Sequence, residues 1–202
     1  MLLALTPDAG GAAPGSTRPS AASLERVVYE AIQHGDERQA GRVYASLLPA
    51  VQATLWRVLG CPDRNHRELT RRSIEQVILE LARHAEPTQC RLEVWATASA
   101  ARVALDALRA RAGRSEANAS WGDDTAQPPV ADAGDTSNGA SIDRLRWLLA
   151  ELPRQQAEAV VLCDVMGLDV LDAALALRLG VEHLGRLLAA GHERLARQMA
   201  LA

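Results

Sequence analysis

Apolar residues recur every three or four positions through most of the chain, which is the period of amphipathic α-helices. In the first part of the sequence this period is clearest over about 40–59, 66–84 and 92–111. A shorter helix is expected to begin near Ser23, a residue type that suits an N-cap. Pro49 lies inside the first long segment and is expected to kink or divide that helix.

Shorter helices are expected after residue 150. An apolar segment covers 152–165, and Gly167 interrupts it. Gly180 then separates a short Ala/Leu helix from a last helix that ends near Met199. Short helices joined by tight turns within so brief a span are typical of a helix-turn-helix unit.

Composition divides the chain into four parts. Residues 1–20 are rich in Gly, Ala, Pro and Ser and are predicted to be a disordered tail. Residues 113–141 lose the apolar period, carry one Arg against five acidic residues, and are predicted to be a flexible acidic linker. Two small helical domains are therefore expected, at 21–112 and 142–202. Because aromatic residues make up only 3% of the chain and Phe is absent, Ala, Leu and Val must build an all-α core.

The charges and cysteines narrow the function classes. The net charge of −3 argues against a protein that coats nucleic acid indiscriminately. The three cysteines, Cys61, Cys90 and Cys163, are widely spaced and odd in number, which fits a reduced cytoplasmic protein without a metal site. No nucleophile motif or phosphate-binding glycine loop is found. We therefore expect no catalytic residues, cofactor or small-molecule substrate, and the lack of a bilayer-length apolar run predicts no membrane insertion.

A resemblance to a known family is concentrated between residues 152 and 195. The residues that carry it, in order and without a gap, are Leu152-Pro153, Gln156, Val160-Val161-Leu162, Asp164-Val165, Gly167-Leu168, Ala174, Leu177, Leu184, Leu188 and Glu193-Arg194-Leu195. This segment resembles region 4 of bacterial sigma-70-family transcription initiation factors, in particular the extracytoplasmic-function (ECF) group.

The helices before the linker resemble region 2 of the same family. The stretches that carry this second resemblance are Val43–Val51, Ile74–Ile78, Trp95, Arg102 and Ala104–Arg109. The resemblance implies a sigma factor that binds core RNA polymerase and directs it to the −10 and −35 elements of promoter DNA. It also implies an anti-sigma factor as a candidate regulatory partner.

The resemblance implies three sets of binding residues. The core-polymerase-binding set is Ile74, Glu75, Gln76 and Val77. The set for the −10 element is Trp95, Arg102 and Arg109. The set for the −35 element is His183, Arg186, Arg194 and Arg197. A structural reading remains open beside the first two, because the helix of Ile74 could simply fill a bundle and Trp95 could be a core anchor.

Two questions of function remain open: the role of the linker, and whether the last helix reads promoter sequence. The resemblance implies that the linker threads the polymerase channel and mimics nucleic acid there, which its acidic residues Asp123, Asp124, Asp132 and Asp135 suit. A plain spacer of the same composition is the alternative. In the last helix, Gly185 and Leu187 occupy positions that are basic in the family, and Arg178 replaces its usual turn glycine. The alternative is thus a degenerate sigma-fold protein that acts through protein contacts with little promoter reading. A simple helix-turn-helix repressor is a third option, but it would not explain the N-terminal helices.

Overall fold

The computed structural model describes residues 30, 34, 37–60, 65–83, 91–120 and 136–200, and the regular structure in these ranges is entirely helical. The predicted all-α fold class is confirmed. Three predictions concern residues outside those described: the tail at 1–20, the helix that begins near Ser23, and the acidic residues between 121 and 135.

The first two long helices follow the predicted periodicity. Helix α2 covers Glu37–Leu59 and helix α3 covers His66–Ala82. The α2 residues that face the core are Val43, Leu47, Val51, Leu55, Val58 and Leu59. Pro49 lies on the exposed side of α2, and the helix is not divided there.

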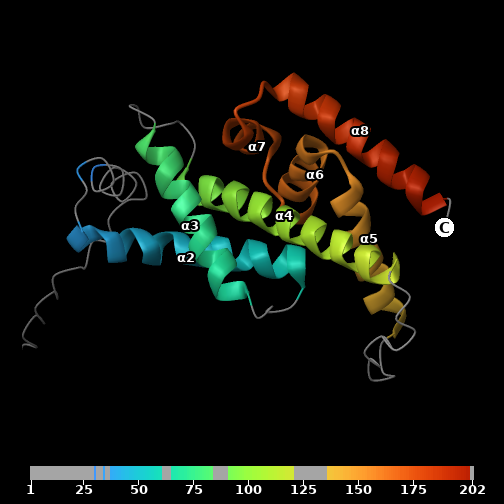
Figure 1. The fold of residues 1–202 in the computed structure, drawn as a ribbon. Helices are drawn as coiled ribbons and strands as arrows, with labels where there is room; N and C mark the ends of the chain where they lie inside the picture. The colour runs from blue at the N-terminus through green and yellow to red at the C-terminus, as the bar shows by residue number, and fades with distance from the viewer. Residues whose placement is uncertain are drawn as a thin grey trace, which may run out of the picture.

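Helix α4, Leu92–Ser120, is the central element of the fold. It lies between α2 and α3 on one side and the C-terminal helices on the other (Figure 1). Residues 94–101 are buried without interruption, as expected for a helix that is covered all round. Small side chains allow close approach, and the Ser99 hydroxyl donates a 3.0 Å hydrogen bond to the Ser73 carbonyl of α3.

The helices predicted after residue 150 appear in the expected order. They are α6 (Arg154–Val160) with the π-helical turn η1 (Val161–Val165), α7 (Val170–Leu177) and α8 (Val181–Ala200). Helix α5 (Thr136–Glu151), which precedes them, was not predicted. The side chain of Asp169 caps α7 by accepting a 2.8 Å hydrogen bond from the backbone N–H of Asp172. Helices α4 and α5 both extend into the segment predicted as linker, so its two ends are helical.

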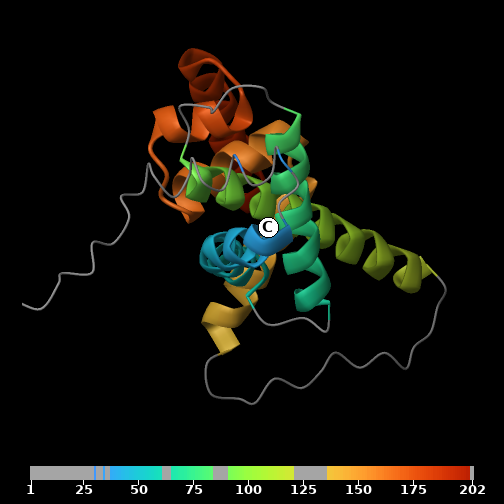
Figure 2. The same ribbon diagram turned by 90° about the vertical axis from the view of Figure 1, so that its left-hand side faces the viewer.

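Helices α2–α4 form the N-terminal half and α5–α8 the C-terminal half, and the two halves share one apolar core. Figures 1 and 2 show α6 and α7 directly on α4, while the last turns of α4 extend beyond the packed helices. The two predicted domains are separate segments of the sequence. In the folded chain, however, the two halves are in extensive contact.

Substitution by alanine should have opposite effects on stability at two glycines of α8. A Cβ at Gly191 would lie 2.9 Å from Cγ2 of Val160, a buried and β-branched side chain of α6. A Cβ at Gly185 would meet no described atom within 4 Å. We expect Gly185→Ala to raise the free energy of unfolding by up to about 1 kcal/mol through helix propensity. Gly191→Ala should lower it by about 1–3 kcal/mol through overpacking, and urea denaturation of the two variants provides the comparison.

Candidate nucleic-acid interface

The three residues predicted to contact the −10 element lie on one face of α4. Trp95, Arg102 and Arg109 follow at intervals of seven residues, which is two helical turns and about 10.5 Å per interval. This face is turned towards the C-terminal half, and Trp95 is only 3% exposed. In this conformation DNA therefore has no access to the Trp95 ring.

The guanidinium of Arg178 lies over the ring of Trp95, with Cζ 5.2 Å from the ring centroid. Arg178 follows α7 and adopts a left-handed backbone conformation, with φ 56°. Such a conformation costs an L-residue about 1–2 kcal/mol, which explains why glycine is favoured at such a turn. The cation–π contact compensates by about 0.5–2 kcal/mol and joins the helix-turn-helix to α4.

Arg102 is held between carboxylates of both halves. Its Nη1 is 2.8 Å from Oε1 of Glu80 on α3, and its Nε is 3.6 Å from Oε1 of Glu158 on α6. Glu158 is buried and also accepts a 3.0 Å hydrogen bond from Nε of Arg154. This hydrogen bond raises the pKa of Arg154 above its usual value. The cluster keeps its charges paired where burial would otherwise make them costly.

Arg109 binds the end of α5. Its Nε donates to the carbonyl of Ala150 at 3.3 Å, and its Nη2 donates to the carbonyl of Leu152 at 3.2 Å. These carbonyls belong to the last turn and end of a helix, where the backbone lacks helical N–H partners. Arg109 therefore serves as a C-terminal cap for α5 across the contact between the halves.

A fourth residue on the same face was not predicted. Arg91 immediately precedes α4, and its Nη2 is 2.7 Å from Oδ2 of Asp172 on α7. This hydrogen bond raises the pKa of Arg91 above its usual value. Arg91, Trp95, Arg102 and Arg109, here named the α4 stripe, thus all contact the C-terminal half.

The predicted polymerase-binding residues divide between the core and the surface of α3. Ile74 and Val77 are buried, with exposed fractions of 2% and 0%. Glu75 is exposed and pairs with Arg71, while Gln76 is half-buried and donates a 3.4 Å hydrogen bond to Glu80. A partner could therefore contact Glu75 and Gln76 without disturbing the core.

The four residues predicted for the −35 element are all exposed on α8; they are His183, Arg186, Arg194 and Arg197. Leu184 and Leu195 hold the opposite face of this helix in the core. Arg197 is paired with Glu193 at 2.9 Å, an exposed pair that DNA could displace at little cost. This surface of α8 is accessible, but glycine and apolar residues lie between its basic side chains.

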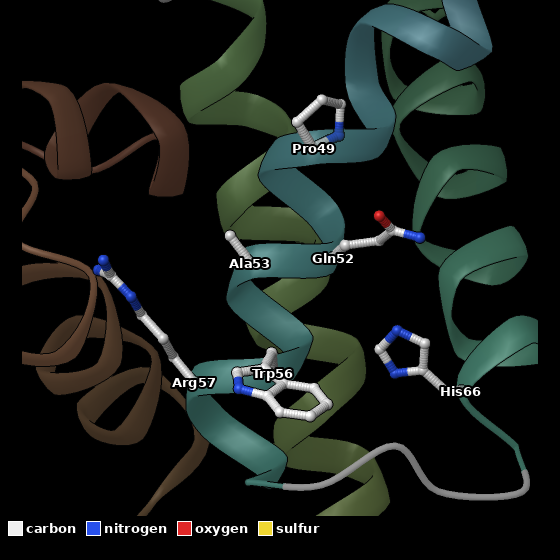
Figure 3. A pocket seen from close by; sticks show the side chains of 6 residues that line it. All are labelled: Pro49, Gln52, Ala53, Trp56, Arg57 and His66. Carbon is white, nitrogen blue, oxygen red and sulfur yellow. The ribbon is translucent and has the colours of Figure 1, made fainter.

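A shallow groove of about 560 Å³ lies on the outer face of α2 and beside the start of α3. Figure 3 shows its lining residues, which are Pro49, Gln52, Ala53, Trp56, Arg57 and His66. Trp56 is 52% exposed, and the α2 core residues point away from the groove into the helical bundle. This apolar surface was not predicted, because Trp56 lies outside the apolar period of its helix.

No protein-family model and no curated protein matches this sequence. The solved structure of CnrH in complex with the cytosolic domain of CnrY does match. The alignment covers 88% of this chain and 98% of that chain, with a TM-score of 0.51 and 14% sequence identity.

The chain has an all-α fold that resembles that of CnrH. The predicted resemblance is thus confirmed at the level of the fold, and the match includes helices from both halves because it covers most of both chains. In the part of the chain that the structure describes, none of the helices combines the length and apolarity needed to span a membrane.

Proposed function

We propose that this chain is a transcription initiation factor of the ECF type, which binds core RNA polymerase and directs it to promoter −10 and −35 elements. The observation that carries the proposal is the likeness of the fold to that of CnrH, which extends over 88% of the chain. Exposed cations on α8 suit the −35 element, and the α4 stripe suits the −10 element once it is uncovered. By analogy with CnrH, a regulator domain is proposed as a further partner.

The contacts of the α4 stripe and the composition of α8 also favour a second candidate function. In that function the chain acts through protein partners and reads little or no promoter sequence. Exposed apolar residues such as Trp56 on α2 and Leu79 on α3 support this alternative. Run-off transcription with purified core polymerase and a genomic fragment library separates the two, because only a promoter-reading factor yields discrete transcripts.

The polymerase contact gives a direct prediction. Replacing both Glu75 and Gln76 by Arg should weaken co-purification with core polymerase about tenfold or more, because the exposed charge of this face is reversed. Both side chains lie outside the core, so the free energy of unfolding should change by only about 0.5–1 kcal/mol. Pull-down of polymerase subunits measures the effect, with urea denaturation as the folding control.

A matched substitution tests whether the effect belongs to this face. Arg67→Glu also changes an exposed charge of α3, but in the first turn of the helix, away from Glu75 and Gln76. This variant should retain the polymerase. Equal retention of all three proteins would remove the Glu75–Gln76 surface from the proposed function.

A further inference from the structure

We propose that the cleft between the end of α3, the middle of α4 and the turn after α7 binds a compact phosphate-bearing anion, for which a diphosphate group is the best match. The inference goes beyond the proposed function and does not depend on it. It rests on three arginines that three different elements bring to one cleft. Because residues of both halves line the cleft, a bound anion also bridges the two halves.

The cleft has a volume of about 250 Å³ and lies where the end of α3 and the turn after α7 approach α4 (Figure 1). The described residues that line it are Glu80, Arg83, Arg102, Ala176, Leu177 and Arg178. Three guanidinium groups against one carboxylate leave an excess of positive charge in this lining. The excess is local, because the whole chain has a net charge of −3. The cleft therefore attracts anions within a protein that is otherwise negative.

Arg102 is held in place and still has donors for a ligand. Its Nη1 lies 2.8 Å from Oε1 of Glu80, and its Nε lies 3.6 Å from Oε1 of Glu158. Among the described residues none accepts a hydrogen bond from its Nη2. Since a guanidinium carries five N–H donors, two carboxylates can fix its plane while Nη2 remains available. Such support from neighbouring groups orients a binding residue before the ligand arrives.

Arg178 is held by stacking on an aromatic ring. Its Cζ lies 5.2 Å from the centroid of the Trp95 ring. Stacking uses the face of a guanidinium and leaves the N–H groups at its edge able to donate to a ligand. The backbone of Arg178 has φ 56°, a conformation that is strained for a residue with a side chain. Strain of this kind is concentrated at ligand-binding sites, and glycine would relieve it without providing a guanidinium.

Arg83 provides the third cation of the cleft. It directly follows α3 and is exposed, so a ligand can reach the cleft from solvent. Arg83 forms no ion pair with any residue that the structure describes. Its charge is therefore not neutralised within the described part of the chain, in contrast to that of Arg102.

The size and charge of the cleft indicate the class of ligand. Pockets for drug-sized molecules measure about 300–1,000 Å³, so a cleft of about 250 Å³ suits a smaller group. Guanidinium groups form short, charge-assisted hydrogen bonds with phosphate oxygens, often two at a time. A diphosphate group has enough charged oxygen atoms to contact all three arginines. The carboxylate of Glu80 opposes this binding and should lower the affinity.

The test is isothermal titration calorimetry of the full chain with sodium pyrophosphate, at constant ionic strength and without divalent cations. The unmodified chain should bind pyrophosphate at a single site. Arg83→Gln should weaken the affinity about tenfold or more, because a hydrogen bond between charged groups is lost. Arg72→Gln is the matched control, since it removes the same charge from an exposed position of α3 outside the cleft and should leave the affinity unchanged.

Arg178→Gly tests whether the C-terminal half contributes to the site. This substitution removes the guanidinium from the turn after α7 and relieves the backbone strain, so the chain should still fold. The affinity for pyrophosphate should again fall about tenfold. A loss with Arg83→Gln but none with Arg178→Gly would place the anion on the N-terminal half alone and overturn the shared site.

A variant that gains affinity distinguishes binding from a folding defect. Glu80→Gln removes the carboxylate from the lining, and because Glu80 and Arg102 both belong to the N-terminal half, no ion pair between the halves is lost. The affinity for pyrophosphate should rise about three- to tenfold. Glu151→Gln makes the same charge change at an exposed position of α5 and should leave the affinity unchanged.

Titration with ADP identifies the source of the diphosphate. Binding of both ADP and pyrophosphate supports a nucleotide whose phosphates lie in the cleft, and binding of pyrophosphate alone supports the free anion. No binding of either by the unmodified chain overturns the inference. Binding that Arg83→Gln, Arg178→Gly and Glu80→Gln all leave unchanged overturns it as well. The assay contains neither polymerase nor promoter DNA, so its failure and the failure of the proposed function are distinguishable.

Discussion

Replacing Leu105 by Ala should lower the free energy of unfolding by about 2–5 kcal/mol. Leu105 is fully buried near the middle of α4, the helix against which both halves pack. Its removal leaves a cavity in a core that the two halves share. Urea denaturation followed by circular dichroism should therefore show one cooperative transition that moves to lower urea with an unchanged slope.

The control for this prediction is Leu171→Ala on α7. Leu171 is 60% exposed, so its truncation should change the free energy of unfolding by no more than about 0.5 kcal/mol. Two separate transitions, of which only one responds to Leu105→Ala, would show that the halves unfold independently. That outcome would also mean that the contacts along the α4 stripe contribute little to the cohesion of the molecule.

Two features could be predicted because both depend on local periodicity. They are the positions of the helices and the placement of Trp95, Arg102 and Arg109 on one face of α4. Apolar spacing locates α3 over His66–Ala82, close to the expected 66–84. The intervals between Trp95, Arg102 and Arg109 place them on one face of any helix that contains them. In both cases the pattern that predicts the structure is the spacing of residues within a few helical turns.

What covers that face could not be predicted, because it depends on contacts between residues far apart in the sequence. Arg91 and Asp172 are 81 positions apart, and Arg109 and Leu152 are 43 apart. Nothing in local composition pairs these residues, since arginine and acidic residues occur throughout both halves. The sequence marks Arg178 only as an unusual turn residue, and its contact with Trp95 emerges once the two halves pack together.

The ends of α4 and α5 show a second limit of sequence patterns. Gly, Ser, Asn and Asp are frequent in the segment after Arg111 and indicate a loop. The backbone nevertheless stays helical to Ser120 and resumes at Thr136. Helix propensity is a weak preference that a well-packed preceding helix can override, and α4 is buried along most of its length before this point.

Gly60→Ala should lower the free energy of unfolding by about 2.5–5 kcal/mol, for two reasons that add. Gly60 follows α2 with φ 82°, a conformation that costs residues with a side chain about 1–2 kcal/mol. A Cβ at this position would also overlap the guanidinium of Arg146 on α5. Arg146 would have to release its 3.1 Å hydrogen bond to the Val58 carbonyl, a charged contact between the halves worth about 1.5–3 kcal/mol.

A double-mutant cycle separates these two terms. In an Arg146→Ala background the overlap is absent, so Gly60→Ala should cost only the backbone strain of about 1–2 kcal/mol. Gly180→Ala is the matched control, because a Cβ there meets no described atom within 4 Å and the backbone lies outside the left-handed region. That substitution should leave the free energy of unfolding within about 1 kcal/mol of the unmodified chain. An equal cost of Gly60→Ala in both backgrounds would mean that Arg146 adapts freely, and that its hydrogen bond to α2 does not help to hold the halves together.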